Sequence, residues 1–281
     1  MTSIHDGARA LTLADADAIR DALDVDPVTD LFLDARLRPA IASGDLRDEV
    51  VGQREPSGRH SLCWLGANVV PTANTSDDAA DAYARQVRSR NVWFSSLWGP
   101  RAPVARMWSR LSGTTRRPRS VRELQHFMVL DAEPDLASDR EVVRVDMSHF
   151  DAYYAAAVAF NIEELGQSPE LYGGGAYYRA RVRGLIQNRH AFGIFDDGQL
   201  VAKADIAFPT PHASMVQGVW VAPDARGHGL GREVVGAASV VARTEIAPVV
   251  TLYVNAFNVP AHRCYRRLGY VESAEFMTLL W

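Results

Sequence analysis

The stretch VWVAPDARGHGLG, residues 219–231, constrains the fold of this chain more than any other segment. A run of strand-forming residues stops at Pro223, and glycines then stand at alternate positions, Gly227, Gly229 and Gly231. The next letters, REVVGAASVVARTEI, have helical spacing. Glycine adopts positive φ and has no Cβ, so a ligand can approach the backbone of such a turn closely. The pattern predicts a strand that passes through a glycine turn into a helix.

The start of that helix is the candidate binding feature. The first N–H groups of a helix have no partner inside it, and the helix dipole adds partial positive charge, so the turn suits a phosphate. Arg232 and Glu233 stand where a Walker-type loop needs Lys and Ser or Thr. The G-x-G-x-G spacing, late in the chain, is not the dinucleotide fingerprint either. The plain alternative is a glycine turn that holds no ligand.

Size and charge limit the class of protein. With 281 residues, 47% of them hydrophobic, the chain can form one large domain or two of ordinary size. No apolar run approaches the roughly 20 residues that span a bilayer, and the N-terminus lacks the apolar stretch of a signal peptide. Cys63 and Cys264 stand far apart and indicate neither a disulfide framework nor a metal cluster. We therefore expect a cytoplasmic protein, and the net charge of −4 argues against a nucleic-acid partner.

The chain has 30 basic residues, of which Lys203 is the one lysine. We take this bias as a sign of genome composition rather than of chemistry. The polar segment VLDAEPDLASDREVV, residues 129–143, is the candidate linker. It divides the chain into an N-terminal domain, residues 1–135, and a C-terminal domain, residues 141–281. Strand-like and helical stretches alternate in both, which predicts an α/β class with a mixed sheet.

The C-terminal part has a readable order of elements. A strand is followed by two helices, the first with Ser148 as its N-cap. Asp197 and Gly198 predict a hairpin between two strands. Another strand, the glycine turn, a helix to about Glu245, a strand, a short helix and the closing strand FMTLLW follow. We expect a mixed sheet with helices packed against it.

Two motifs resemble those of the GNAT superfamily of N-acetyltransferases. Arg226, Gly229 and Gly231 fit its acetyl-CoA motif, R/Q-x-x-G-x-G/A. The stretch LYVNAFNVPAHRCYRRLGY is similar to the superfamily's next strand and helix, with an Asn, an Ala, a Tyr and a Gly-aromatic pair in order: Asn258, Ala261, Tyr265 and Gly269–Tyr270. The resemblance spans about residues 141–281 and implies a GNAT-like acyl-CoA N-acyltransferase domain.

The layout of the whole chain resembles a group of actinobacterial GNAT proteins in which an uncharacterised domain precedes the GNAT domain. Residues 1–130 contain no R-x-x-G-x-G. If the smaller N-terminal α/β domain is related to GNAT, it is therefore a degenerate copy without the pyrophosphate loop.

The resemblance also implies roles for the backbone. The strand Val219, Trp220 and Val221 would pair with the pantetheine arm, with the Val219 N–H facing the thioester carbonyl as in an oxyanion hole. Burial of these side chains in the core is compatible with that role. The pyrophosphate loop would comprise Arg226, Gly227, His228, Gly229, Leu230, Gly231 and Arg232, in which His228 has the plainer interpretation of a solvent-facing residue. Asn258 would contact the cofactor, or would simply cap its helix.

Catalytic groups come from the same resemblance. Tyr265 would protonate the departing thiolate, since a phenol stays protonated at neutral pH; filling the core is the alternative. Some relatives use a Glu on the strand before the loop as general base, but SMVQGVW has no carboxylate. We therefore expect Glu164, narrowly ahead of Glu163, although paired carboxylates are often a solvated helix face. Asp205 and His212 are the other candidates.

The sequence thus predicts an N-acetyltransferase that uses acetyl-CoA as acetyl donor, needs no metal, and transfers the group directly to an amine. The acceptor is a small molecule or a peptide; no nucleic acid or membrane is expected, and a homodimer is allowed. The alternative is a non-catalytic module that binds CoA thioesters for sensing or for partner interaction.

Overall fold

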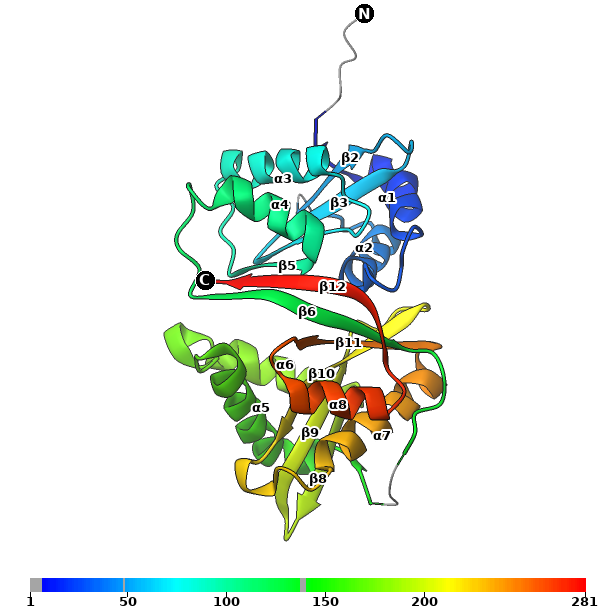
Figure 1. Ribbon diagram of the computed structural model, residues 1–281, viewed down its shortest axis with the longest axis vertical. Helices are drawn as coiled ribbons and strands as arrows, with labels where there is room; N and C mark the ends of the chain where they lie inside the picture. The colour runs from blue at the N-terminus through cyan, green and yellow to red at the C-terminus, as the bar shows by residue number, and fades with distance from the viewer. Residues whose placement is uncertain (1–6, 48, 137–139) are drawn as a thin grey trace, which may run out of the picture. The chain divides into compact units, whose positions relative to one another are not determined.

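The computed structural model describes residues 7–47, 49–136 and 140–281 and divides into two compact units that interleave along the chain (Figure 1). Unit 1 contains the described residues up to Phe127, with Tyr253–Phe257 and Glu272–Trp281; unit 2 contains Met128–Leu252 and Asn258–Val271. The sequence predicts a single cut near residues 135–141. The structure instead assigns the end of the chain to unit 1, because the last strand pairs there.

In unit 1, the first four strands in sheet order pair antiparallel with one another, and the fifth pairs parallel with the fourth. The two longest strands of the unit follow. The C-terminal strand pairs antiparallel with the fifth and lies beside the sixth, red beside green in Figure 1. In sheet order the strands are β1 (Arg9–Ala10), β2 (Val50–Arg54), β3 (His60–Leu65), β4 (Asn68–Pro71), β5 (Ser96–Pro100), β12 (Val271–Leu280) and β6 (Ser120–Leu130).

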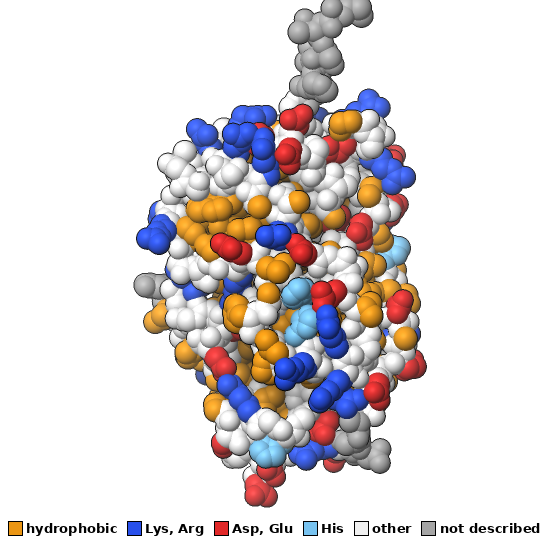
Figure 2. All heavy atoms as spheres, viewed as in Figure 1, with side chains coloured by type: hydrophobic (Ala, Val, Ile, Leu, Met, Phe, Trp, Pro, Cys, Tyr) orange, Lys and Arg blue, Asp and Glu red, His pale blue; other side chains and the backbone are white. Residues whose placement is uncertain are grey.

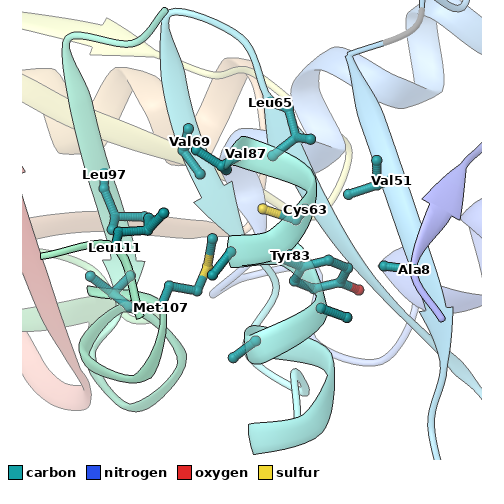
Figure 3. Packing of buried hydrophobic residues seen from close by; sticks show 14 of the residues in the cluster. Ala8, Val51, Cys63, Leu65, Val69, Tyr83, Val87, Leu97, Met107 and Leu111 are labelled. Carbon is teal, nitrogen blue, oxygen red and sulfur yellow. The ribbon is translucent and has the colours of Figure 1, made fainter. Parts of the chain in front are cut away.

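Two helices follow β1 and one follows each of β4 and β5: α1 (Ala16–Leu23), α2 (Leu31–Ser43), α3 (Asp77–Ser89) and α4 (Arg101–Leu111). The apolar faces of α3 and α4 pack on the sheet, where Tyr83 and Met107 approach Cys63 and Leu97 (Figure 3). The buried Tyr83 hydroxyl is satisfied by Ser61 at 2.7 Å. Unit 1 therefore has a core of its own.

Unit 2 repeats this arrangement. Its strands, in sheet order, are β7 (Val143–Arg144), β8 (Ala191–Asp196), β9 (Gln199–Ala207), β10 (Ala213–Val221) and β11 (Val249–Asn255), with neighbours antiparallel up to β10 and β11 parallel to β10. Its helices are α5 (Phe150–Leu165), α6 (Gly175–Gln187), α7 (Leu230–Glu245) and α8 (Val259–Arg267).

Each unit thus runs through a strand, two helices, three antiparallel strands, a helix, a parallel strand and a helix. The predicted mixed α/β class is confirmed in both. The hairpin at Asp197 and Gly198 is also confirmed, with φ of 45° and 76°.

Two local expectations need correction. Ser148 is not the N-cap of α5, because the Asp146 carboxylate accepts the Ser148 N–H at 2.8 Å and caps a short 3-10 helix before it. The segment expected to be a linker packs on unit 2: Leu136 lies against Gly236 of α7, and Glu133 pairs with Arg243 at 2.8 Å. Residues 137–139 of that segment lie outside the described residues.

Arg and acidic side chains are interspersed on the face drawn in Figure 2. Among the described helices, none combines the length and the apolar character needed to traverse a bilayer.

Candidate functional site

The site predicted from sequence begins at an open edge of β10. Parallel pairing with β11 runs from Ala213–Val249 to Met215–Thr251 and goes no further along β10. On the other edge, pairing with β9 continues to Val221. Among the residues that the structure describes, no strand pairs with this edge of the outer half of β10. An extended ligand can add itself to a sheet at such an edge.

Two amides of this segment point to the open edge. The Ala222 N–H bonds Val201 on the β9 side at 2.8 Å, so by the alternation of antiparallel strands the Val221 N–H points away from β9. The pairing shifts between Gln217 and Trp220, which is a β-bulge. Inside it the Gly218 carbonyl accepts a hydrogen bond from the Lys203 side chain, so the Val219 N–H, at the other side of the same trans peptide, points away from that ammonium.

The glycine turn follows directly. Gly227 and Gly229 have φ of 85° and 83°, and Gly229 is the N-cap of α7. A Cβ added at either would meet no heavy atom within 4 Å, so the space in front of the turn is open. Within the part of the chain that the structure describes, the amides of Gly227, His228 and Gly229 form no hydrogen bond. These N–H groups at a helix start are a fitting cradle for a diphosphate.

The side chains of the turn are mostly committed elsewhere. Arg226 donates to the Val221 carbonyl at 3.1 Å and to Glu163 of α5 at 2.6 Å. The His228 ring lies 3.3 Å from the Ala225 carbonyl and is exposed. The remaining positions contact their own unit: Leu230 is buried, Gly231 lies against Val221, and Arg232 pairs with Asp135. Backbone rather than side chains therefore faces the open space at the turn.

Tyr265 projects from α8 and is 8% exposed, with its ring 6.1 Å from that of Tyr270. Burial raises the pKa of Tyr265 far above its ordinary value, and Cys264, Tyr270 and Glu164 add to the shift. The phenol is therefore protonated throughout the neutral range. Glu164 of α5 contributes the smallest of these effects.

Asn258 caps α8, because its side-chain oxygen accepts the Ala261 N–H at 3.2 Å. His212 lies in the turn before β10, at the opposite end of that strand from the glycine turn, and is exposed. Trp220 is half-buried against the core of unit 2. The other predicted residues lie on β9, β10, the turn, α5 and α8.

A buried charged cluster under the bulge was not predicted as a unit. Lys203, with a side chain 1% exposed, pairs with Asp205 at 3.0 Å, and the Tyr153 hydroxyl donates to the same carboxylate. Burial lowers the pKa of Lys203, and the Asp205 carboxylate opposes that effect. Two features of the sequence indicate such a cluster. Residues 203 and 205 share one face of a strand, and a glycine inside a strand often marks a bulge.

The matching turn of unit 1, between β4 and α3, is filled by the chain itself. Asp30 accepts the Ala73 N–H at 2.8 Å, Glu55 accepts the Ser76 N–H at 3.3 Å, and the Ser76 side chain accepts the Ala79 N–H. Two carboxylates, Asp77 and Asp78, occupy the first turn of α3. Satisfied amides and negative charge make this turn a poor place for a phosphate.

Comparison with known proteins agrees with this geometry. Residues 158–270 match the sequence profile of the Acetyltransferase (GNAT) family, and residues 49–153 match that of a domain of unknown function, DUF4081. No curated protein sequence matches the chain significantly.

Solved structures resemble the chain over nearly its whole length. A GCN5-related N-acetyltransferase from Sphaerobacter thermophilus is 17% identical, with 97% of this chain and 94% of that chain covered and a TM-score of 0.61. A Drosophila protein is 16% identical, with 98% and 99% covered and a TM-score of 0.63. A tandem GNAT protein from the clavulanic acid biosynthesis pathway is 14% identical, with 96% and 97% covered and a TM-score of 0.53. At such identities the likeness shows the fold alone. The chain therefore has a GNAT fold, with a GNAT acetyltransferase-family domain at residues 158–270 after a DUF4081 domain at residues 49–153.

Proposed function

We propose that this protein is an acetyl-CoA-dependent N-acetyltransferase that acts on an amine. The observation that carries the proposal is the pairing of an open β10 edge with a glycine turn whose amides form no hydrogen bond among the described residues. A CoA thioester has an extended pantetheine arm and a diphosphate, and these two features need a strand edge and a helix start, respectively.

The residues present fit this donor. Gly227 and Gly229 leave free the space that a Cβ would occupy, so phosphate oxygens can approach the amides of the turn. Val219 and Val221 offer N–H groups at the open edge to the amide carbonyls of the arm. When bound, the thioester supplies an activated acyl group; the chain supplies its orientation.

Three groups would act during transfer. The Val219 N–H stabilises the negative charge that develops on the acyl oxygen. Glu164 takes a proton from the amine, directly or through water, as the N–C bond forms. Tyr265 donates its proton to the sulfur as the C–S bond breaks; burial raises the pKa of the phenol, so the proton is present when the step begins. The products are an amide and free CoA.

The second candidate is a non-catalytic module that binds CoA thioesters. Its support is that the carboxylates of Glu163 and Asp205 are held in ion pairs with Arg226 and Lys203, and that β10 carries none. A sensor of this kind would bind the thioester with no turnover.

Calorimetry and a thiol-release assay distinguish the acetyltransferase from the non-catalytic sensor. Acetyl-CoA is titrated into the wild-type protein and into Gly229→Glu, which places a carboxylate in the turn. CoA release is then followed with a panel of small amines, polyamines, aminoglycosides and peptides, and with propionyl-CoA beside acetyl-CoA. Binding that Gly229→Glu abolishes, with amine-dependent release, supports the enzyme. Binding without release from any acceptor supports the sensor, and no heat of binding overturns both.

A further inference from the structure

We propose that the buried Lys203–Asp205 pair is a positioning device for the Val219 amide, the group assigned above to the acyl oxygen. The inference rests on the proposed function and deepens it. It concerns why this particular amide points to the open edge of β10 and how strongly it can donate.

The link is one peptide group. The carbonyl of Gly218 and the N–H of Val219 belong to the same planar trans unit and point in opposite directions. Lys203 Nζ donates to the Gly218 oxygen at 2.7 Å. By holding that oxygen, the ammonium fixes the plane of this peptide and keeps the N–H on the opposite side, away from the buried pair.

The ammonium is itself held in place. Its side chain is 1% exposed, Asp205 Oδ1 lies 3.0 Å from Nζ, and the rings of Tyr153 and Phe160 have their centroids 5.0 and 5.5 Å away. Tyr153 also donates to Asp205 and so fixes the carboxylate. A buried, fully packed cation cannot turn to another acceptor without leaving an unpaired charge behind.

Gly218 is part of the same arrangement. Its φ is +60°, and a Cβ built there would lie 2.5 Å from Asp205 Oδ2 and 2.9 Å from Lys203 Nζ. The ion pair therefore fills the space against the backbone of the bulge. Only a glycine lets the carbonyl come this close to the cation.

A cation on the carbonyl also changes the amide. Hydrogen bonds along a chain of groups polarise one another, so a charged donor on the oxygen makes the N–H of the same peptide a better donor. Loss of one oxyanion-hole donor lowers kcat by about 10²–10³. Since the N–H remains when the cation is removed, we expect a smaller loss, about 10- to 100-fold in kcat, with little change in KM.

The test uses Lys203→Met combined with Asp205→Asn, which removes both charges and leaves neither buried alone. Arg144→Met is the matched control, because it deletes a paired cation of the same unit, one that binds Glu245 at 2.8 Å. The double variant should lose kcat and keep its affinity for acetyl-CoA; the control should keep both. A second pair, Lys203→Gln with Asp205→Asn, restores a donor near the Gly218 oxygen and should recover part of kcat.

Infrared difference spectra of bound acetyl-CoA with a ¹³C-labelled carbonyl give a readout that stability does not move. In the wild type the carbonyl stretch should fall below its value in water, and in the Met–Asn variant it should return toward that value. An unchanged stretch or unchanged kcat in the variant overturns the positioning role while the acetyltransferase assignment survives. Failure of the wild type to bind acetyl-CoA overturns both. If the Met–Asn variant does not fold, the Gln–Asn variant, which loses the charge but keeps a donor, should still show a partial loss of kcat and a partial return of the stretch, and wild-type values of both overturn the positioning role.

Discussion

Arg226 Nη2 lies 2.6 Å from Glu163 Oε2, so the glycine turn is tied to the end of α5 by an ion pair whose side chains are 46% and 51% exposed. Exposed pairs of this kind contribute about 0–1 kcal/mol to stability. The contact gives Glu163 a structural partner at the turn, so Glu164 stays the proposed general base.

The two glutamates therefore form a matched pair of variants. Glu164→Gln should lower kcat by about 10²–10⁴, the range for loss of a general base. Glu163→Gln should leave kcat within about threefold, since exposed ion pairs contribute little. Steady-state kinetics with the best amine of the panel measures both. If Glu163→Gln proves the more damaging, the base is misassigned.

Tyr265→Phe tests the acid. It removes one hydroxyl from a buried ring, so acetyl-CoA should bind with unchanged affinity while kcat falls by about 10²-fold or more. Because burial raises the pKa of Tyr265, the phenol keeps its proton through the neutral and mildly alkaline range. The wild-type pH profile should accordingly show no loss of kcat from this group below about pH 10, the ordinary pKa of a tyrosine. A Phe variant as fast as the wild type removes Tyr265 from the mechanism.

Substitutions at Gly229 separate backbone strain from electrostatics. With φ of +83° and nothing within 4 Å of a Cβ, the position limits residues by conformation and not by space. Gly229→Asn should fold with a loss of about 1 kcal/mol or less and keep measurable binding, because Asn tolerates the left-handed region. Gly229→Glu should fold similarly yet lose binding through repulsion of phosphate. Thermal melts give the first comparison and calorimetry the second; equal binding by both variants would contradict the cradle.

The contacts of Asp81 in unit 1 predict that the folded protein loses stability in acid. Its carboxylate accepts two hydrogen bonds each from Arg106 and Arg110, at 2.7 to 2.8 Å, and these bonds lower the pKa of Asp81 below its ordinary 3.8. When the pKa of a carboxyl group is lower in the folded state, its ionised form stabilises the fold at pH values above the pKa of the unfolded state. That contribution is lost as the pH falls toward the pKa of the folded state.

Asp81→Asn should thus lower the free energy of unfolding at pH 7. Between about pH 4 and 2, the free energy of unfolding of this variant should decrease less steeply than that of the wild type. Urea titrations across that range measure it, with Asp17→Asn on an exposed helix face as control. A variant whose stability falls with acid as steeply as the wild type would show that the arginines do not act through Asp81.

Much of unit 2 could be read from the sequence because its signals are local. The hairpin at Asp197 and Gly198 needs only a turn pair between two strand-like runs. The strand, glycine turn and helix around Gly229 likewise follow from adjacent residues. The site residues proposed there lie on the expected elements, and their roles stay predictions.

What sequence reasoning missed depends on long-range contacts. The burial of Lys203 and its contact with Gly218 depend on the packing of α5 and β9, which the composition of the chain does not reveal. Asp146 and Ser148 stand two positions apart, and both residue types are good N-caps, so the sequence did not determine which of them acts as the cap. The terminal strand was assigned to the nearer domain because a periodic pattern carries no information on which sheet it joins.

That last strand has a consequence for how the protein is made. β12 pairs from Phe276–Pro100 to Leu280–Ser96, so a strand that is synthesised early in this sequence is completed by one that is synthesised much later. Until Val271–Leu280 has been synthesised, β5 lacks the strand that pairs with that edge among the described residues. A premature stop codon just before Val271 would therefore damage unit 1, which contains the N-terminal part of the sequence, as much as unit 2.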